Sequence, residues 1–292
     1  MELEVFESVQ LAKGPSLFLL SSWIKDNDRL TVGFSGRDGG VSASPWTSLN
    51  FGLHVGDEDE AVVRNRRLLA EALGWPFEAW TSAEQVHGCE VAAVTADERG
   101  KGRNSRAEAI QDTDALMTDV PGVLLTSFYA DCVPLYFYDP EHEAVALAHA
   151  GWKGTVLEIA DKTVRAMKER YGSRLEAIRG AIGPSIGDCC YEVDSHVIER
   201  IEPLLETFDN GELSGEKRNS MMKMVENGKA MVNLKQMNRQ IMIKAGILPI
   251  HIEMSQWCTG CNREYFYSHR MEGGSTGRMA SWIGIRERGT HE

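Results

Sequence analysis

The sequence has no long hydrophobic run, no excess of positive charge and few cysteines, and each shortage excludes a class of protein. The apolar stretch 17–23 is too short to span a bilayer. There are 31 Lys and Arg residues against 43 Asp and Glu, so the net charge of −12 would repel a nucleic-acid backbone. Six cysteines in 292 residues are too sparse for a disulfide scaffold. We therefore expect neither a membrane nor a nucleic-acid partner.

The first residues also lack the features of an export signal. Residues 1–7 are acidic, whereas a secretory signal begins with a basic segment. We therefore expect a cytoplasmic protein, whose cysteines are free thiols or metal ligands in that reducing compartment. An apolar content of 42% with 25% charged residues is that of an ordinary globular chain with a sizeable core.

Short apolar runs typical of β-strands recur along the whole chain. They cover residues 30–35, 89–94, 115–118, 122–128, 135–138, 144–148, 178–182, 251–255 and 279–285. Asp139 and Pro140 separate two runs of similar length, which predicts a hairpin at this point. This hairpin is expected to bring Cys132 and His149 toward the same sheet.

Three segments carry the three- and four-residue apolar spacing of helices. They cover residues 57–73, 155–171 and 233–245, and each is followed by a glycine that can end a helix. Asp57 followed by Glu60 is a pattern resembling a capping box, so the first helix is predicted to start there.

The order of these elements favours an α+β fold. Helices are inserted among the strands instead of alternating strictly with them, and neither a G-x-G-x-x-G motif nor a P-loop is present. We predict a single domain over residues 1–292, made of packed mixed β-sheets flanked by helices. The polar stretch 207–229 carries Asn-Gly and Ser-Gly turn pairs and is predicted to be a surface excursion within that domain, with a linker as the alternative.

His87, Cys132 and His149 each begin or end one of the short apolar runs. Two imidazoles and a thiolate suit Zn²⁺, and three protein ligands leave a fourth position for water or substrate, as in catalytic zinc sites. A single histidine on an apolar run is more often a hydrogen-bonded structural residue, but the three together favour a metal site. Copper is an alternative ion, because Cu²⁺ outcompetes Zn²⁺ for most nitrogen and sulfur ligand sets.

Residues near these three are candidates for supporting roles. Asp131 can transfer a proton, orient a ligand or simply cap a turn. Arg37 lies in the glycine-rich stretch 33–42, which either holds a phosphate or is a plain loop. Lys153 follows His149 and precedes a predicted helix, whose first N–H groups can face an anion.

The remaining cysteines and histidines give weaker signals. Residues 258–261 form a C-x-x-C, but a structural zinc site needs two such pairs and a redox site needs a βαβ setting, and neither is found. The adjacent Cys189 and Cys190 are interpreted as core packing or chance. The other histidines are expected to be structural, namely His54, His142, His196, His251, His269 and His291.

Several motifs together resemble one family. They are Gly39-Gly40-Val41-Ser42, Asn50, His54-Val55-Gly56-Asp57, Gln85-Val86-His87-Gly88, Asp114-Ala115-Leu116-Met117-Thr118, Ala130-Asp131-Cys132-Val133-Pro134, His149-Ala150-Gly151-Trp152, Gly183-Pro184-Ser185-Ile186 and Cys258-Thr259. In this order they resemble the bacterial purine nucleoside phosphorylase family formerly labelled laccase-like or multicopper polyphenol oxidase. The match runs from about Thr31 to Ile285.

The resemblance implies a single α+β domain with zinc held by His87, Cys132 and His149. It also implies phosphorolysis of adenosine, inosine and methylthioadenosine to the free base and ribose 1-phosphate or methylthioribose 1-phosphate, together with deamination of adenosine. The implied partners are purine nucleosides and phosphate, and a homodimer is compatible with the sequence. The oxidase label fits poorly, because a multicopper oxidase needs His-x-His pairs and the eight histidines here form none.

Each of the two implied reactions needs its own supporting residues. For deamination, zinc would activate water, and Asp131 is the candidate proton shuttle. For phosphorolysis, cationic groups must offset the phosphate charge, and Arg37, Lys153 and the start of the Thr155 helix are the candidates.

Two other functions remain open. A cysteine hydrolase would use Cys132 as nucleophile and His149 as base, with Asp131 or another carboxylate orienting the imidazole. A zinc-binding interaction module would hold metal without turnover. Metal content and activity separate these alternatives.

Overall fold

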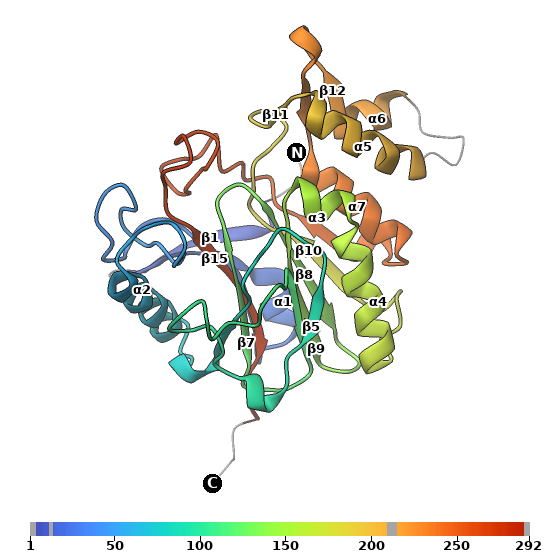
Figure 1. Ribbon diagram of the computed structural model, residues 1–292. Coiled ribbons are helices and arrows are strands. Elements are labelled where there is room, and N and C mark those ends of the chain that lie inside the picture. Colours follow the sequence, from blue (N-terminus) through green and yellow to red (C-terminus); the bar gives the residue numbers. More distant parts are fainter. Residues whose placement is uncertain (1–3, 12–13, 209–214, 289–292) are drawn as a thin grey trace.

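Two six-stranded mixed sheets form the centre of the computed structural model, which describes residues 4–11, 14–208 and 215–288 (Figure 1). The first sheet contains, in spatial order, β1 (Phe6–Gln10), β2 (Ser16–Leu20), β3 (Leu30–Ser35), β15 (Met279–Ile285), β7 (Leu124–Tyr129) and β4 (Trp80–Ser82). The second contains β14 (Ile252–Met254), β10 (Arg179–Ile182), β8 (Val133–Asp139), β9 (Ala144–Ala150), β6 (Ala115–Thr118) and β5 (Val91–Ala93).

Helices flank the two sheets. They are α1 (Ser21–Asp26), α2 (Asp59–Ala72), α3 (Trp152–Val156), α4 (Ile159–Tyr171), α5 (Ser195–Thr207), α6 (Gly215–Met221) and α7 (Leu234–Lys244). Single turns of 3₁₀-helix occur at η1 (Phe77–Ala79), η2 (Ala96–Glu98), η3 (Glu226–Gly228) and η4 (Pro249–His251). The predicted α+β class, a single domain of packed mixed sheets flanked by helices, is confirmed.

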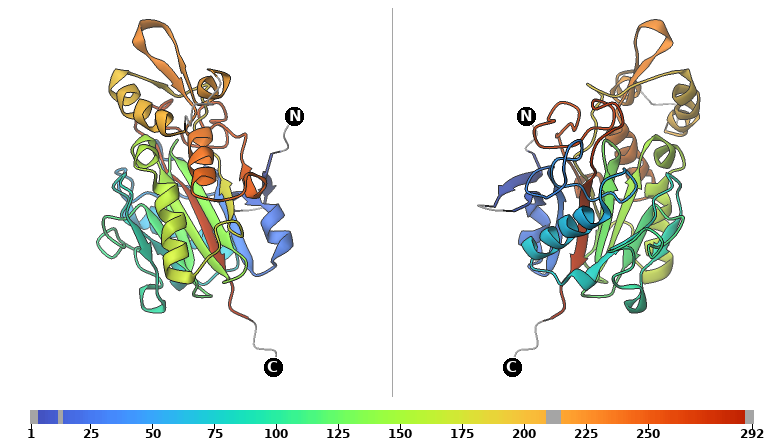
Figure 2. Two further views of the ribbon diagram at one scale, coloured as in Figure 1. Left: turned by 90° about the vertical axis from the view of Figure 1, so that its right-hand side faces the viewer. Right: turned by 60° about the vertical axis from the view of Figure 1, so that its left-hand side comes forward.

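The two sheets pack face to face, and helices cover their outer faces (Figure 2). Between the sheets, Phe34 and Ile283 of the first pack with Tyr136 and Leu147 of the second. The Tyr136 hydroxyl also donates a hydrogen bond to the Gly33 carbonyl at 2.9 Å, which ties β8 to β3. Every residue of β7, β8 and β9 is buried, as expected for strands covered on both faces.

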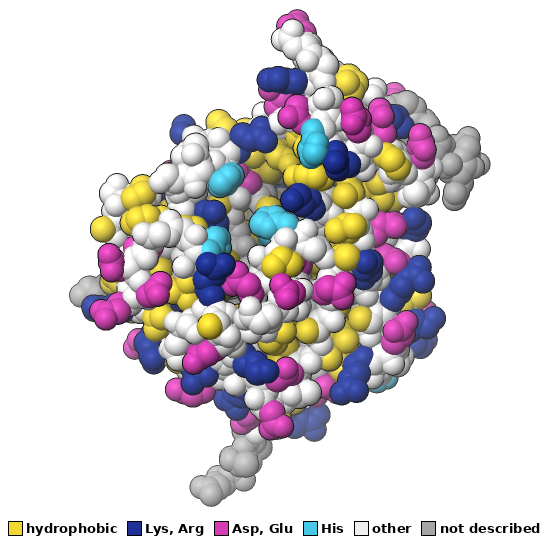
Figure 3. Space-filling view, in the orientation of Figure 1, with side chains coloured by type: hydrophobic (Ala, Val, Ile, Leu, Met, Phe, Trp, Pro, Cys, Tyr) yellow, Lys and Arg dark blue, Asp and Glu magenta, His cyan; other side chains and the backbone are white. Residues whose placement is uncertain are grey.

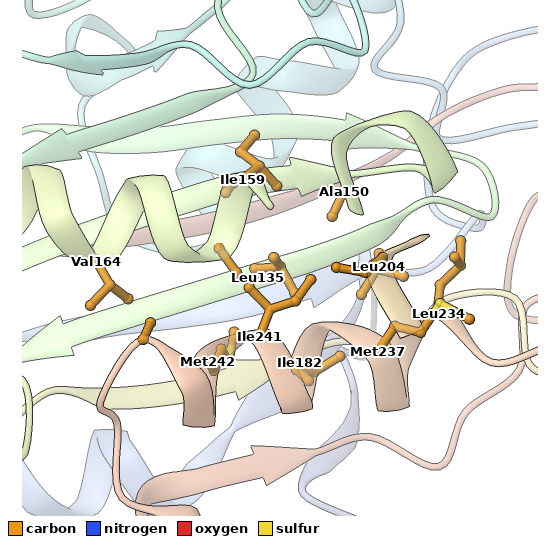
Figure 4. Close-up of a cluster of buried hydrophobic side chains, with 14 of the residues drawn as sticks. Leu135, Ala150, Ile159, Val164, Ile182, Leu204, Leu234, Met237, Ile241 and Met242 are labelled. Carbon is orange, nitrogen blue, oxygen red and sulfur yellow. The ribbon is translucent and has the colours of Figure 1, made fainter. Parts of the chain in front are cut away.

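A second layer of core lies between the second sheet and helices α4, α5 and α7. Leu135 of β8, Val164 of α4 and Ile241 of α7 are among the apolar side chains that fill it (Figure 4). On the opposite side of the molecule, Leu69 of α2 and Trp282 of the first sheet belong to one cluster of buried apolar side chains. The strands that carry the site residues are therefore held rigidly from both sides.

A small third sheet lies with α5 and α6 at one end of the molecule (Figures 1 and 2). Its strands are β11 (Glu192–Val193), β13 (Ala230–Val232) and β12 (Met222–Met224). Within the predicted excursion 207–229, residues 209–214 lie outside the described residues, and the rest includes α6, β12 and η3. The polar composition of this stretch did not predict those elements. The excursion itself stays a prediction.

The predicted strands and the predicted hairpin agree with the structure. Strands β8 and β9 pair antiparallel on either side of the turn at Asp139 and Pro140, and Pro134 lies opposite His149 in this register. Strands β1, β2 and β4 were not predicted from the sequence. Among the described residues, no helix combines the length and apolar character needed to cross a membrane.

Two of the helix predictions need correction. The segment predicted as one helix over 155–171 is two helices, α3 and α4, because Glu158 between them adopts a left-handed conformation with φ of 54°. Helix α2 begins at Asp59, not Asp57, whose carboxylate instead accepts a hydrogen bond from the Asn50 side chain at 2.9 Å. Helix α7 and the glycine that follows it agree with the prediction.

Candidate functional site

Three elements bring His87, Cys132 and His149 together. His87 lies in the loop between β4 and β5, Cys132 in the turn between β7 and β8, and His149 near the end of β9. One ligand atom from each lies within 4.8 Å of the other two. The two imidazole rings meet edge to face, with centroids 4.8 Å apart. His149 is buried, Cys132 is half-buried and His87 is exposed, so the cluster opens to solvent on one side.

The carboxylate of Asp114 holds this cluster in place. Its Oδ1 accepts a hydrogen bond from Nδ1 of His149 at 2.9 Å, which leaves Nε2 of that ring for a ligand. The same carboxylate accepts backbone N–H bonds from Val86, His87 and Gly88, at 3.2, 3.0 and 2.6 Å. One buried side chain therefore orients His149 and fixes the loop that carries His87.

Two local backbone features shape the cluster. His87 adopts a left-handed conformation with φ of 59°, which is uncommon for a residue with a side chain and here accompanies the three N–H bonds to Asp114. Gly151 follows β9 where a Cβ would lie 3.0 Å from Cys132 Sγ and 3.4 Å from His87 Cδ2. A side chain at position 151 would therefore crowd two of the three candidate ligands.

The electrostatics of the cluster favour a thiolate next to a charged imidazole. Burial alone would raise the pKa of the Cys132 thiol, but His149 and His87 lower it to about 6 through their charges and hydrogen bonds. Burial alone would lower the pKa of His149, but Cys132 and Asp114 raise it to about 9. Burial also opposes ionisation of Asp114, yet its hydrogen bonds to His149 and the backbone lower its pKa.

Two cavities meet at the cluster. One of about 340 Å³ is lined by Leu53, His54, Arg66, Ser82, Ala83, Glu84, Gln85, His87, Gly102, Arg106, Ala109, Phe128, Ala130, Cys132, His149, His269 and Arg278. The other, of about 240 Å³, is lined by His87, Ala130, Asp131, Cys132, Gly151, Trp152, Ile186, Tyr191, Leu234, His269 and Arg270. Figure 3 shows histidine and Lys or Arg side chains gathered around a hollow on this face of the molecule.

The larger cavity has cationic walls. Arg278 donates to the Thr276 and Gly277 carbonyls at 2.9 and 3.0 Å, and no carboxylate of the described residues forms an ion pair with it. Arg106 also lines the cavity and is paired with Glu84. The pKa of His54 is lowered to about 4 by desolvation and by these two arginines, so the imidazole is neutral at pH 7.

The structure places Arg37 and Lys153 outside both cavities. The Arg37 guanidinium donates to Glu272 at 3.0 Å and to the Arg263 carbonyl at 3.0 Å, and it stacks on Tyr267. Lys153 lies on α3 with its Nζ 5.7 Å from the centre of the Trp152 ring, and it is exposed. Neither residue is among those that line the space next to His87 and Cys132.

Asp131 lies beside the cluster but is engaged elsewhere. Its Oδ1 accepts a hydrogen bond from the Thr259 hydroxyl at 2.6 Å, and its Oδ2 accepts one from the Arg270 backbone N–H at 2.7 Å. Its backbone is left-handed, with φ of 87°. Asp131 thus connects the Cys132 turn to the segment 258–270, and Asp114, not Asp131, orients His149.

Sequence reasoning missed Asp114, Arg278, His54 and His269 as site residues. Asp114 appeared only within a family motif, although a carboxylate directly before an apolar strand was a usable signal. Its function depends on the pairing of β6 with β9, which sets Ala115 opposite Ala148. Arg278 precedes β15, which is far from β9 in sequence, so no local pattern connected it to the site.

Comparison with known proteins identifies the family to which this chain belongs. Residues 31–286 match the family described as multi-copper polyphenol oxidoreductase laccase. The purine nucleoside phosphorylase YlmD of Geobacillus stearothermophilus is 42% identical over 259 residues, which cover 89% of this chain and 91% of that protein. The purine nucleoside phosphorylase YlmD of Bacillus subtilis is 38% identical, covering 94% of this chain and 96% of the relative.

Solved structures show the same architecture. The crystal structure of YlmD from Geobacillus stearothermophilus superposes with a TM-score of 0.88 at 40% identity and covers 98% of this chain and 100% of that one. The crystal structure of the Bacillus licheniformis hypothetical protein YfiH gives 0.86 at 41% identity, covering 96% of this chain and 99% of that one.

Fold and site together define a two-sheet α+β protein with a His-Cys-His cluster between two cavities. The chain belongs to the laccase-like family described as multi-copper polyphenol oxidoreductase laccase, in which the relatives named above are purine nucleoside phosphorylases. The predicted family is confirmed.

The low pKa of Cys132 predicts the pH dependence of its alkylation in metal-free protein. Because a thiolate is the reacting form, the rate with iodoacetamide should be high at pH 7 and fall as the pH drops through about 6. His149→Ala should move this midpoint upward, toward the value of about 8.5 for an ordinary thiol. Mass spectrometry of the Cys132 peptide over a pH series measures both midpoints.

A rate at Cys132 that still rises strongly between pH 7 and pH 9 would contradict the thiolate assignment. Added zinc serves as a control, because a thiolate that ligates a metal should be shielded from the reagent.

Proposed function

We propose that the protein is a zinc-dependent purine nucleoside phosphorylase. It would cleave adenosine, inosine and methylthioadenosine with phosphate, giving the free base and ribose 1-phosphate or methylthioribose 1-phosphate, and it would also deaminate adenosine. The observation that carries the proposal is the convergence of His87, Cys132 and His149 within 4.8 Å at the junction of two cavities. The names of the two YlmD relatives support the reaction class.

The chemistry of the donor set fits zinc. Two imidazole nitrogens and one thiolate make a three-ligand set that leaves a fourth position open. The bond from Asp114 to His149 Nδ1 is the carboxylate support that metal-ligating histidines usually have. Bound Zn²⁺ would supply a Lewis acid to polarise the substrate. The same donors suit Cu²⁺, so copper stays an alternative ion.

We assign phosphate to the larger cavity. Arg278 has no anionic partner among the described residues, and it lies beside Arg106 and His54 on the cavity wall. A partly buried guanidinium without a carboxylate partner favours an oxyanion, and its planar fork can bind two phosphate oxygens. The neutral His54 imidazole can donate a hydrogen bond to the phosphate without placing a third positive charge beside Arg278 and Arg106.

We assign the purine ring to the smaller cavity. Trp152, Ile186 and Leu234 offer apolar surface there, and an aromatic side chain suits a flat heterocycle. A nucleoside spanning both cavities would place its sugar near His87 and Cys132, which line the two spaces. This arrangement brings phosphate and the sugar carbon together, and such positioning lowers the barrier to their reaction.

The roles first predicted for Arg37, Lys153 and Asp131 stay predictions. Arg37 is held by Glu272 and Lys153 is exposed, so we favour Arg278 and Arg106 for phosphate. Both oxygens of Asp131 already accept hydrogen bonds, so proton transfer through it in deamination would require one of these bonds to change.

A second candidate function, a cysteine hydrolase, is favoured by one specific observation. Cys132, His149 and Asp114 form a thiolate, imidazolium and carboxylate series like that of cysteine hydrolases. Metal content separates the two functions, because a metal-bound thiolate is not a free nucleophile. A zinc-binding interaction module is the remaining alternative and would show metal without turnover.

The proposal includes a cytoplasmic location. It leaves open whether the protein is a monomer or a homodimer. The six cysteines are free thiols in the structure, as expected in a reducing compartment. The proposed partners are nucleosides and phosphate, without nucleic acid or membrane.

The direct test of the proposed function uses purified protein of known metal content incubated with adenosine, with and without phosphate. Adenine should form only with phosphate, and inosine should form without it. His87→Ala should lose the zinc held by Cys132 and His149 and both activities together, because it removes one of the three ligands of that ion. Chromatography of adenine, inosine and hypoxanthine measures the products.

Three results would each contradict a different part of the proposed function. Full activity of His87→Ala that has lost the zinc of the His87, Cys132 and His149 site would exclude the proposed role of this site. No conversion by zinc-loaded protein would exclude the nucleoside reaction and favour the interaction module. An inactive, metal-free protein whose Cys132 alkylates readily would favour the hydrolase.

The phosphate assignment predicts a selective kinetic defect. Arg278→Gln should raise the KM for phosphate about 10-fold or more, as expected for loss of one charge-assisted contact worth about 1.5–3 kcal/mol. The KM for the nucleoside should change much less. Initial rates over a phosphate series measure the effect.

Arg37→Gln and Lys153→Gln are the matched controls, since each removes one cationic group outside the two cavities. A larger phosphate defect in either control than in Arg278→Gln would reverse our assignment and restore the residues first predicted.

A further inference from the structure

Four cysteines outside the candidate active site come together in space. Cys189 and Cys190 follow β10, and Cys258 and Cys261 follow β14, about seventy residues later in the chain. Their four sulfur atoms all lie within 4.8 Å of one another. The sulfur of Cys261 is 3.4 Å from those of both Cys189 and Cys190. Of the two interpretations given for Cys189 and Cys190, core packing or chance, core packing is wrong for Cys189, because its side chain is exposed.

The spacing of the four sulfurs is close to that of a tetrathiolate metal site. With zinc–sulfur bonds of about 2.3 Å in a tetrahedron, neighbouring sulfurs lie about 3.8 Å apart. The four sulfurs here lie at comparable separations, from 3.4 Å between Cys189 and Cys261 to at most 4.8 Å. The cysteine spacing did not predict this cluster, because the second pair is an adjacent Cys-Cys and not a second C-x-x-C.

The backbone around the sulfurs is also arranged for a metal site. The Gly187 N–H donates a hydrogen bond to Cys258 Sγ at 3.2 Å, which stabilises a thiolate. A Cβ at Gly187 would lie 3.2 Å from Cys189 Sγ, and one at Gly260 would lie 3.0 Å from Cys190 Sγ. Both glycines therefore leave room for the sulfurs to converge.

A buried positive charge lies next to this cluster. Lys235 is only 6% exposed, and its ammonium group donates to the Ser255 and Trp257 carbonyls, both at 3.0 Å. The second of these carbonyls directly precedes Cys258. A zinc ion with four thiolates carries a net charge of −2, so a nearby buried ammonium offsets part of it.

We propose that Cys189, Cys190, Cys258 and Cys261 form a second metal site, which binds Zn²⁺ with four sulfur ligands and no open position. Four thiols bind one Zn²⁺ and release four protons. A closed set of four thiolates is typical of a structural zinc ion, which stabilises the fold.

The site would clamp two loops that form one wall of the smaller cavity. The first loop carries Ile186, which lines that cavity and donates its N–H to the Asp131 carbonyl at 3.0 Å. The second carries Thr259, whose hydroxyl donates to the Asp131 carboxylate at 2.6 Å. Both hydrogen bonds are accepted by Asp131, the residue directly before Cys132. The ion would thus hold the wall without touching substrate.

The test counts zinc in purified protein with the other candidate site disabled. Cys132→Ala should retain about one zinc per chain, with four sulfur neighbours at about 2.3 Å by X-ray absorption. Cys132→Ala with Cys261→Ser should lose that zinc to a chelator at least 10-fold more readily, because one ligand is gone. Cys132→Ala with Cys89→Ser is the matched control and should keep it.

Two outcomes would overturn the proposal. One is a Cys132→Ala protein that, after incubation with zinc, holds no metal or shows no four-sulfur environment. This measurement needs no change in the four cysteines. The other is a metal-free protein whose mass under non-reducing conditions is lower by two hydrogens per disulfide formed among these cysteines. The test does not depend on nucleoside turnover, so its failure is separate from failure of the proposed function.

Discussion

The hydrogen bonds of the Asp114 carboxylate are the interaction on which the candidate site depends. The buried charge is stabilised by His149 Nδ1 on one side and by three backbone N–H groups of the His87 loop on the other. A charge buried to this extent must be satisfied by such partners, so neither segment can move away without a large cost. Two candidate ligands from distant parts of the chain are thereby fixed relative to each other.

The frame around this carboxylate explains why the third ligand is also in place. The β8–β9 hairpin sets Pro134 opposite His149, which positions Cys132 at the adjacent turn. Both strands are buried between the first sheet and the layer of α4 and α7, so the hairpin has little freedom. At the other side of the cluster, Asp131 connects to Thr259 and Arg270, and the proposed four-cysteine site would secure that connection.

The parts of this architecture that depend on local pattern were predictable from the sequence. The hairpin at Asp139 and Pro140 follows from two apolar runs and a turn. The features that local pattern did not reveal depend on pairing between distant segments. Asp114, for example, reaches His149 only because β6 lies beside β9. Arg37 and Arg278 each follow a glycine in the sequence, and only the structure separates them, because Arg278 lines the larger cavity whereas Arg37 lies outside it and is paired with Glu272. The four cysteines likewise meet only because β10 and β14 are parallel neighbours.

The zinc affinity of Asp114→Asn tests the central claim most directly. An amide at this position offers one acceptor oxygen in place of two and no negative charge, so the His149 ring and the His87 loop should both lose orientation. We expect zinc binding at His87, Cys132 and His149 to weaken about 10- to 100-fold in chelator competition. Asp139→Asn is the matched control, because Asp139 also bonds a histidine, His142, at 2.7 Å, but in the hairpin turn. Unchanged zinc affinity in Asp114→Asn, or an equal loss in Asp139→Asn, would contradict the account.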